Sequence, residues 1–491
     1  MESSSLRSGS AGSRTPSARR SLAITCALAF TLALAAVGTA SGRPEGSLGV
    51  ALGETANVSQ GTASAKGAVS VTAFGADVRF STPVPTTARV AYGVGDALAL
   101  FTPLLPPAGE HTAHLDGLRP DTTYRVRISV TGVSGGHGSS ETTVHTAPLA
   151  VGARAAISGG ALTLDDEPFF PFLVFGQCDT WDQSLARGVN VFQLGGCLDE
   201  NETAEAAAVS GRAFVATDAV PKVSTPNQIG YTYDDEADEH GGTYETLPAL
   251  PPWQSTGKVS FLTLTNHFYS KAASLPAGKG MYPGLAKRAD ILGFDLYPLQ
   301  VWCRFDSFAD VYYSQRELDT LVQGRPTYQW IETAPMQCPG EALKPTPQTV
   351  EAETWLAVAG GADGIGWFPW DPSNEQVSDT MKRLADEILS LQPALLAPQL
   401  PTGFSKSKGV YVGARKFNDA VYVIAVNASR RKIAVPMAVG GVSDLTLETW
   451  FEPKRRIRAI SGRFTDTFGP LQAHIYVSAP PDTSAPASVK R

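Results

Sequence analysis

From about residue 150 to residue 398 the chain alternates short apolar segments with helix-like segments, and this alternation restricts the folds open to it. Strands that alternate with helices are typical of βαβ units, whose strands pair in parallel. Segments with strand length and composition lie at 169–175, 189–194, 213–217, 228–233, 259–265, 291–296, 327–331 and 364–368. Eight such units over about 250 residues predict one closed (β/α)8 barrel, a TIM barrel.

Helices are predicted most clearly at 310–323, 348–359 and 374–391. In the last of these, apolar residues recur every three or four positions, and Ser373 is expected to cap its first turn. Only residues 221–227 separate the third strand from the fourth, too few for a full helix. That unit is therefore expected to be degenerate, unless the strand assignment there is misplaced.

A β-rich region precedes the barrel at residues 67–148, with short alternating strands between turn residues. Its segment Leu115-Asp-Gly-Leu-Arg-Pro-Asp-Thr-Thr-Tyr124 resembles a corner of fibronectin type III domains, although Phe80 stands where many of these carry Trp. The resemblance implies a β-sandwich in which the buried Tyr124 hydroxyl bonds the upstream backbone. After the barrel, residues 399–480 predict a small structural β-sandwich, with a hairpin turn at Asn418-Asp419.

The ends of the chain carry signals of a different kind. Residues 1–40 combine Arg19-Arg20, an apolar run too short to span a membrane and small residues, as a secretory signal peptide does. Residues 41–66 have the composition of a linker, and residues 481–491 that of a disordered tail. We therefore expect a secreted protein that has no membrane span once the signal is cleaved.

Charge and motifs exclude several classes of function. The 491-residue chain has a formal charge of −7, and removal of residues 1–40 leaves 36 basic against 46 acidic side chains. This acidity argues against nucleic acid or anionic membranes as partners. The sequence contains no phosphate-binding loop, dinucleotide fingerprint or serine-hydrolase elbow. We expect no metal, since the histidines are too few and too scattered for a dinuclear site. We also expect no cofactor and a monomer.

Four cysteines remain after signal cleavage, and each follows a predicted barrel strand. Cys178 follows the first strand and Cys197 the second, while Cys303 follows the sixth and Cys338 the seventh. Because loops that follow adjacent strands are neighbours, the pairs Cys178–Cys197 and Cys303–Cys338 are expected among the three possible connectivities.

Two predicted strands end in a carboxylate. The fourth is followed by Asp234-Asp235-Glu236, and the seventh by Glu332. Barrels place catalytic groups at these strand ends, and two carboxyl groups suffice to cleave a glycosidic bond.

This arrangement resembles the clan A glycoside hydrolases, over about residues 165–398. The resemblance implies a retaining enzyme with Glu236 as acid/base and Glu332 as nucleophile, acting on a poly- or oligosaccharide. The residue before the acid/base is commonly Asn in that clan, but here it is Asp235, which leaves Asp234 and Asp235 as rivals of Glu236.

Further polar and aromatic residues follow the strand ends, where they would bind sugar hydroxyls or stack on a sugar ring. These candidate substrate-binding residues are Asp179, Trp181, Asp235, Asn266, His267, Asp295, Tyr297, Trp367 and Trp370. For the tryptophans, packing in the core is an equal alternative. A second interpretation of the whole chain is a barrel that binds glycans without cleaving them, flanked by β modules for adhesion.

Overall fold

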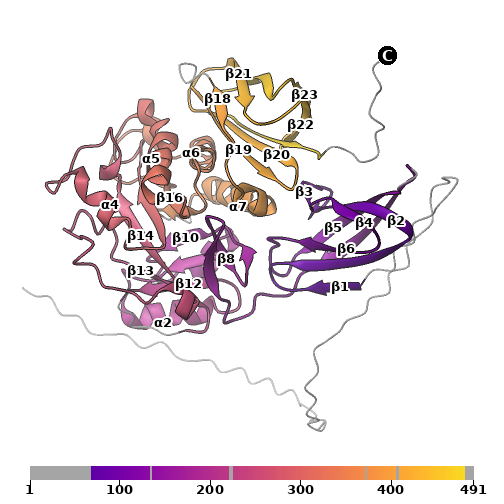
Figure 1. Cartoon of the computed structure of the whole chain (residues 1–491). Coiled ribbons are helices and arrows are strands. Elements are labelled where there is room, and N and C mark those ends of the chain that lie inside the picture. Colours follow the sequence, from indigo (N-terminus) through magenta and orange to yellow (C-terminus); the bar gives the residue numbers. More distant parts are fainter. Residues whose placement is uncertain are drawn as a thin grey trace, which may run out of the picture. The chain divides into compact units, whose positions relative to one another are not determined.

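The computed structural model describes residues 68–132, 135–219, 225–369, 371, 373–404 and 409–480. The predicted signal peptide, linker and tail, together with Trp370, lie outside these residues. Within them the chain contains a central barrel, a β module before it and a β module after it (Figure 1). In the described part, no helix is both long enough and apolar enough to cross a membrane.

Eight parallel strands form the barrel, as the sequence predicts. They are β10 Phe172–Phe175, β11 Val191–Gln193, β12 Phe214–Asp218, β13 Gln228–Thr232, β14 Val259–Thr265, β15 Ile291–Asp295, β16 Thr327–Glu332 and β17 Ile365–Phe368. Each strand pairs with the next, and β10 pairs with β17 through Leu173 and Gly366, which closes the ring. Each lies within a few residues of its predicted position.

Large rings fill the barrel below its mouth, and glycines make room for them. A Cβ atom at Gly293 would lie 2.0 Å from the Tyr328 ring, and one at Gly366 would lie 2.2 Å from the Trp330 ring. The Trp330 indole donates to Thr263 Oγ1 at 3.2 Å, and the Tyr328 hydroxyl lies 2.8 Å from the same atom. The interior is therefore packed, and chemistry is confined to the mouth.

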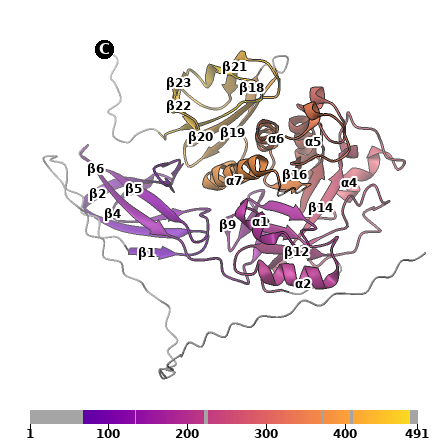
Figure 2. The ribbon, with the colours of Figure 1, turned by 180° about the vertical axis from the view of Figure 1, so that it is seen from behind.

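The helices surround the barrel (Figure 2). They are α1 Trp181–Ala186, α2 Asp199–Ala208, α3 Trp253–Thr256, α4 Tyr282–Leu285, α5 Asp310–Val322, α6 Pro347–Gly360, α7 Glu375–Ser390 and α8 Gln392–Leu395. The three predicted helices are present. The predicted cap of α7 is wrong, because Asn374 accepts the Val377 N–H at 3.3 Å while Ser373 Oγ donates to Asp371 at 2.6 Å. Part of the connection between β12 and β13 lies outside the described residues.

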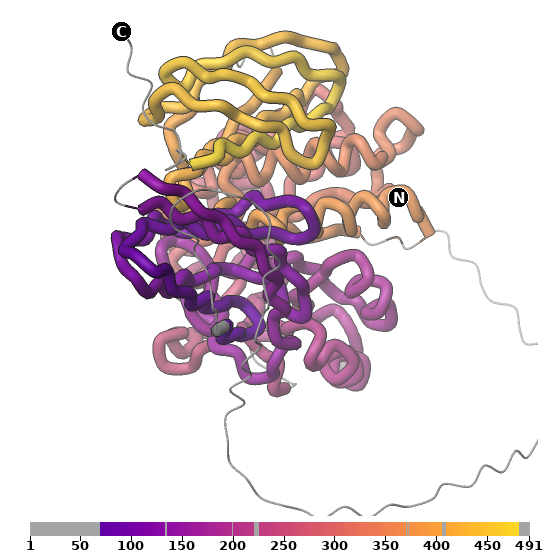
Figure 3. Tube along the Cα trace, turned by 90° about the vertical axis from the view of Figure 1, so that its right-hand side faces the viewer, coloured from indigo at the N-terminus to yellow at the C-terminus, as the bar shows by residue number. Residues whose placement is uncertain are grey.

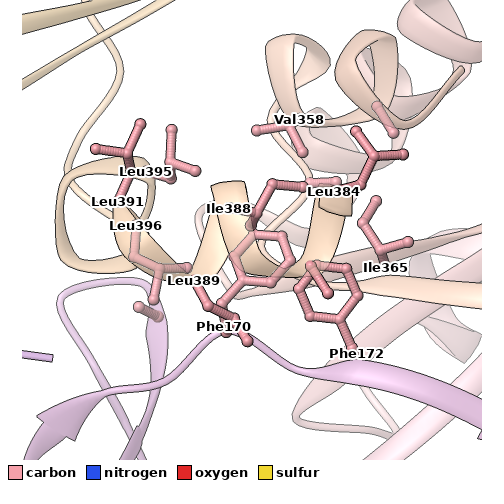
Figure 4. Close-up of a cluster of buried hydrophobic side chains, with 14 of the residues drawn as sticks. Phe170, Phe172, Val358, Ile365, Leu384, Ile388, Leu389, Leu391, Leu395 and Leu396 are labelled. Atoms are coloured by element: carbon pink, nitrogen blue, oxygen red, sulfur yellow. The ribbon is translucent and has the colours of Figure 1, made fainter. Parts of the chain in front are cut away.

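The apolar face of α7 covers the start of the barrel sheet. Leu384 and Ile388 pack among Phe170, Phe172 and Ile365 (Figure 4), and all five side chains are inaccessible to solvent. Burial of an aliphatic side chain of this size contributes about 1.5–3 kcal/mol. Nearly all residues of α6 are buried, since α5, α7 and strands of the C-terminal module pack around it.

The N-terminal module consists of β1 Ala68–Val71, β2 Ala76–Val94, β3 Leu100–Phe101, β4 Leu105–Leu115, β5 Thr123–Gly132 and β6 His137–His145. The long β2 pairs with β4 and β5 in turn. The Tyr124 hydroxyl is buried and accepts the Arg119 N–H at 2.8 Å, as the predicted corner requires. The fibronectin type III assignment itself stays a prediction. A small sheet of β7 Ala155–Ser158, β8 Ala161–Leu164 and β9 Glu167–Pro168 leads into the barrel.

The C-terminal module, which is yellow in Figure 3, has two antiparallel sheets. One contains β18 Thr402–Phe404, β21 Ile433–Val439 and β24 Arg463–Phe468, and the other contains β19 Val410–Phe417, β20 Ala420–Asn427, β25 Ala473–Ser478, β22 Leu445–Trp450 and β23 Arg456–Ala459. Apolar residues of both sheets form one core. Asn418 and Asp419 have φ of 46° and 69°, so the predicted hairpin turn is present.

Candidate active site

The loop after β13 carries the first group of the candidate site and is held firmly. Its Asp238 is buried and accepts the Thr265 N–H at 2.9 Å, the Thr265 hydroxyl at 2.6 Å and the Tyr282 hydroxyl at 2.8 Å. These bonds fix the loop to the end of β14. Glu236 then takes a left-handed conformation with φ of 48°, unusual for a residue other than glycine. Strained residues of this kind are concentrated at functional sites.

The second group is Asp295, the last residue of β15. Its carboxyl group interacts with that of Glu236, and its Oδ1 atom is buried with no hydrogen-bond partner in the described part of the chain. Burial raises the pKa of Asp295 well above its ordinary value, and the hydrogen bond and charge of Glu236 raise it further. Two adjacent carboxyl groups resist double ionisation, so the pair holds a proton, and we place it on Asp295.

Asp235 lies at the rim of this pair. Desolvation, and then the charge of Glu236, raises its pKa to about 6. Both Asp235 and its neighbour Asp234 are exposed at the surface. Of the two rivals of Glu236, only Asp235 interacts with the carboxyl pair in the described structure.

An aromatic surface adjoins the carboxyl groups. Tyr297 is buried, and its ring stacks on Phe368 with 6.0 Å between centroids, while Phe368 meets the Trp330 ring edge-on at 6.5 Å. Burial, and then the charge of Asp295, keeps the pKa of Tyr297 well above its usual range. Phe368 itself is 36% exposed. The mouth therefore offers a flat apolar ring beside a proton donor.

Phe368 is not among the binding residues predicted from the sequence, which include the adjacent Trp367 instead. Trp367 has no exposed surface and stacks on Phe172 at 5.7 Å, within the core shared with the helices. Its assignment to the substrate site is therefore corrected. Successive strand residues point to opposite faces, and this alternation was a signal available in the sequence.

Glu332 requires the largest correction. It is fully buried, and its two carboxylate oxygens accept the Leu299 N–H at 2.9 Å and the Gln300 N–H at 2.8 Å. A second buried acid, Glu353 of α6, bonds to it, and Glu353 Oε1 accepts the Glu332 N–H at 3.4 Å. The sequence-based pairing of Glu236 with Glu332 is thus replaced by the contact of Glu236 with Asp295.

The remaining candidate residues follow strand ends but, within the described structure, do not interact with Glu236 or Asp295. Asp179 is exposed, while Trp181 and Asn266 are half-buried. The His267 ring donates to the Ala273 carbonyl at 2.8 Å, which gives it a role in its own loop. Among the described interactions, none joins these four residues to Glu236 or Asp295.

Both expected disulfide bonds are present. Cys178 is joined to Cys197, and Cys303 to Cys338. The second bond links the loop after β15 to the loop after β16, next to the candidate site. In the described ranges, the side chains spaced to hold a metal ion are His114, Asp116 and Glu167, which are not part of the barrel.

Comparisons with known proteins give distant structural likenesses only. No protein-family model and no curated protein matches the chain. Similar solved structures include a GH30 endoxylanase from Clostridium papyrosolvens (TM-score 0.39, 11% identity, 67% of this chain and 98% of that chain covered). A second is a maltogenic α-amylase from Thermotoga neapolitana (TM-score 0.40, 10% identity, 63% of this chain and 98% of that chain covered). A third is a β-glucuronidase from Ruminococcus gnavus (TM-score 0.33, 9% identity, 65% of this chain and 67% of that chain covered). Likeness at this level assigns neither a family nor a substrate to this chain.

Proposed function

We propose that the barrel mouth hydrolyses O-glycosidic bonds of a poly- or oligosaccharide, with Asp295 as proton donor and Glu236 as the carboxylate facing the anomeric carbon. The observation that carries the proposal is the contact of these two carboxyl groups at the carboxyl end of a closed parallel barrel. A pair that shares one proton contains both an acid and an anion. To flank a glycosidic bond in a retaining reaction, the two carboxyl groups have to separate to about 5–5.5 Å when the substrate oxygen enters between them.

The reaction follows from the protonation of the pair. The substrate oxygen enters between the two groups and takes the proton of Asp295 as the bond from carbon to oxygen breaks. Glu236 stabilises the positive charge that develops at carbon, and in a retaining reaction it bonds that carbon. Water then supplies the new hydroxyl, and its second proton returns to Asp295. One proton remains on the pair at the end of the cycle.

The surroundings support a sugar as the substrate. Phe368 presents an exposed ring that stacks on Tyr297, and apolar rings of this kind pack on the flat face of a pyranose. The two disulfide bonds are consistent with an extracellular protein.

A panel of nitrophenyl glycosides tests the proposal. We expect the full chain to release nitrophenol from at least one of them, and both Asp295→Asn and Glu236→Gln to lower kcat by about a hundredfold or more. The exposed Asp234→Asn is the matched control and should behave as the wild type. Activity in Asp295→Asn equal to that of the wild type would remove this residue from the mechanism.

A glycan-binding barrel without turnover is the second candidate. The enclosure of Glu332 favours it, because one of the two strand-end glutamates is then unavailable for chemistry. This candidate predicts no release from any aryl glycoside, but binding of a glycan that Phe368→Ala weakens.

A further inference from the structure

The buried pair of Glu332 and Glu353 is unexplained by the proposed chemistry. Glu332 ends β16, and Glu353 reaches it from α6, which packs outside the barrel. Both side chains are fully buried, and Glu353 Oε2 has no hydrogen-bond partner among the described residues. Burial of a carboxylate costs free energy unless hydrogen bonds compensate it, so the burial of two carboxyl groups here indicates a specific role.

The bonds of Glu332 indicate that reason. Its carboxylate accepts two consecutive backbone N–H groups, those of Leu299 and Gln300. These residues lie in the loop after β15, within five positions of Asp295 and three of Tyr297. Two N–H groups held by one carboxylate fix both the path and the orientation of that segment.

Further contacts join the same two loops. Gln300 accepts the Met336 N–H at 2.7 Å and donates to the Leu343 carbonyl at 2.7 Å, both in the connection from β16 to α6. The disulfide bond of Cys303 with Cys338 closes the same junction. The loop that follows the proton donor is thus tied to the next loop at several points.

We propose that Glu332 and Glu353 are positioning residues, which clamp the loop after β15 and thereby hold Asp295 and Tyr297 in place at the mouth. Glu353 acts through Glu332 and touches no reacting atom. The inference rests on the proposed function for its catalytic consequence, whereas the clamp itself is a statement about the fold.

The clamp depends on pH. Burial raises the pKa of Glu332 to about 7, and burial together with the charge of Glu332 raises that of Glu353 well above its ordinary value. The groups that face this pair are the Leu299 and Gln300 amides and, through its charge, Tyr297. Ionisation of both buried carboxyl groups would set two negative charges against each other, so loss of a proton from the pair weakens the clamp.

Amide hydrogen exchange measured on the full chain tests the clamp without any substrate. In Glu332→Gln, one of the two amides faces an NH2 group, and we expect Leu299 and Gln300 to exchange about tenfold faster than in the wild type. The exposed Glu341→Gln, in the connection from β16 to α6, is the matched control. Exchange within about twofold of the wild type in Glu332→Gln would overturn the proposal. Circular dichroism establishes whether each variant is folded. If Glu332→Gln does not fold, the test is repeated with Glu332→Asp, whose side chain is too short to reach both amides.

The pH profile of kcat tests the catalytic consequence. In Glu353→Gln the amide donates to an ionised Glu332 and needs no shared proton, so the alkaline fall in kcat should move upward by about one pH unit or more. An unchanged alkaline limb would overturn the positioning role. A wild type with no activity on any glycoside would instead reject the proposed function, and the exchange measurement would still decide the clamp.

Discussion

The carboxyl group of Asp295, at the end of β15, lies against that of Glu236, which follows β13 two strands away in the barrel. The loop that carries Glu236 is pinned by Asp238, and the loop that follows Asp295 is pinned by Glu332. Glu236 and Asp295 are therefore brought together by loops whose backbone is fixed by Asp238 and Glu332. This division between reacting and holding carboxylates is the basis of the predictions below.

Phe368 is expected to contribute to substrate binding. Phe368→Ala should raise KM by about 3- to 10-fold with a smaller change in kcat, since a stacked ring contributes about 0.5–1.5 kcal/mol. Phe368→Trp keeps a flat ring and serves as the conservative control, which should retain a KM near that of the wild type. Equal KM values for all three proteins, from steady-state kinetics on the best aryl glycoside, would exclude stacking at this position.

The sequence predicted the barrel because its signal is repeated. Eight apolar segments, and cysteines after adjacent strands, each restrict the topology, and β10 to β17 and both disulfide bonds agree with them. Segment type follows from composition and periodicity, which are local properties.

The direction of individual side chains could not be predicted in the same way. Trp367 and Phe368 are neighbours with similar chemistry. Alternation along the strand predicts that they point to opposite faces, but it does not say which of the two faces the helices. Glu332 has the strand-end position of a catalytic group, but two amides more than thirty residues earlier in the chain capture its carboxylate. Contacts this distant in sequence leave no local pattern.

Glu205 of α2 should make stability depend on pH. It is fully buried with no hydrogen-bond partner for either oxygen in the described structure, and burial, then the charge of Glu202, raises its pKa to about 8. A folded-state pKa above the unfolded value means that stability falls as pH rises from about 4.5 to about 8. Glu205→Met should therefore be more stable than the wild type at pH 8, by on the order of 4 kcal/mol at most, with little difference near pH 4.5.

Denaturant unfolding at the two pH values checks this prediction. Glu200→Gln, an exposed acid on the same helix, is the control and should leave the free energy of unfolding unchanged. If Glu205→Met is less stable than the wild type at pH 8, the Glu205 carboxyl group stabilises the folded protein and the prediction is wrong.

His114 should also make the free energy of unfolding depend on pH, but here because the fold stabilises the charged form of the side chain. Its ring bonds Glu167 of β9 at 2.7 Å and Asp77 of β2 at 2.8 Å, and the hydrogen bond with Glu167 is the main cause that raises its pKa to about 9. Because the folded pKa exceeds the unfolded value of 6.5, this stabilisation is complete below about pH 6.5 and is lost as pH rises through about 9.

The free energy of unfolding of wild type and His114→Gln, compared between pH 6 and pH 10, measures the effect. The difference between them should be largest at pH 6 and should shrink above about pH 9. The exposed His137→Gln is the control. A difference that stays constant across this range would mean that the charge of His114 contributes nothing.

The most direct measurement compares kcat for Asp295→Asn and Glu332→Gln on the same activated aryl glycoside, with and without azide. Asp295→Asn should lose about a hundredfold or more, as removal of a general acid does. Glu332→Gln should keep a much larger share of the rate, and azide should not restore the remainder. An inactive Glu332→Gln that azide rescues, beside a fully active Asp295→Asn, would contradict the pairing of Asp295 with Glu236.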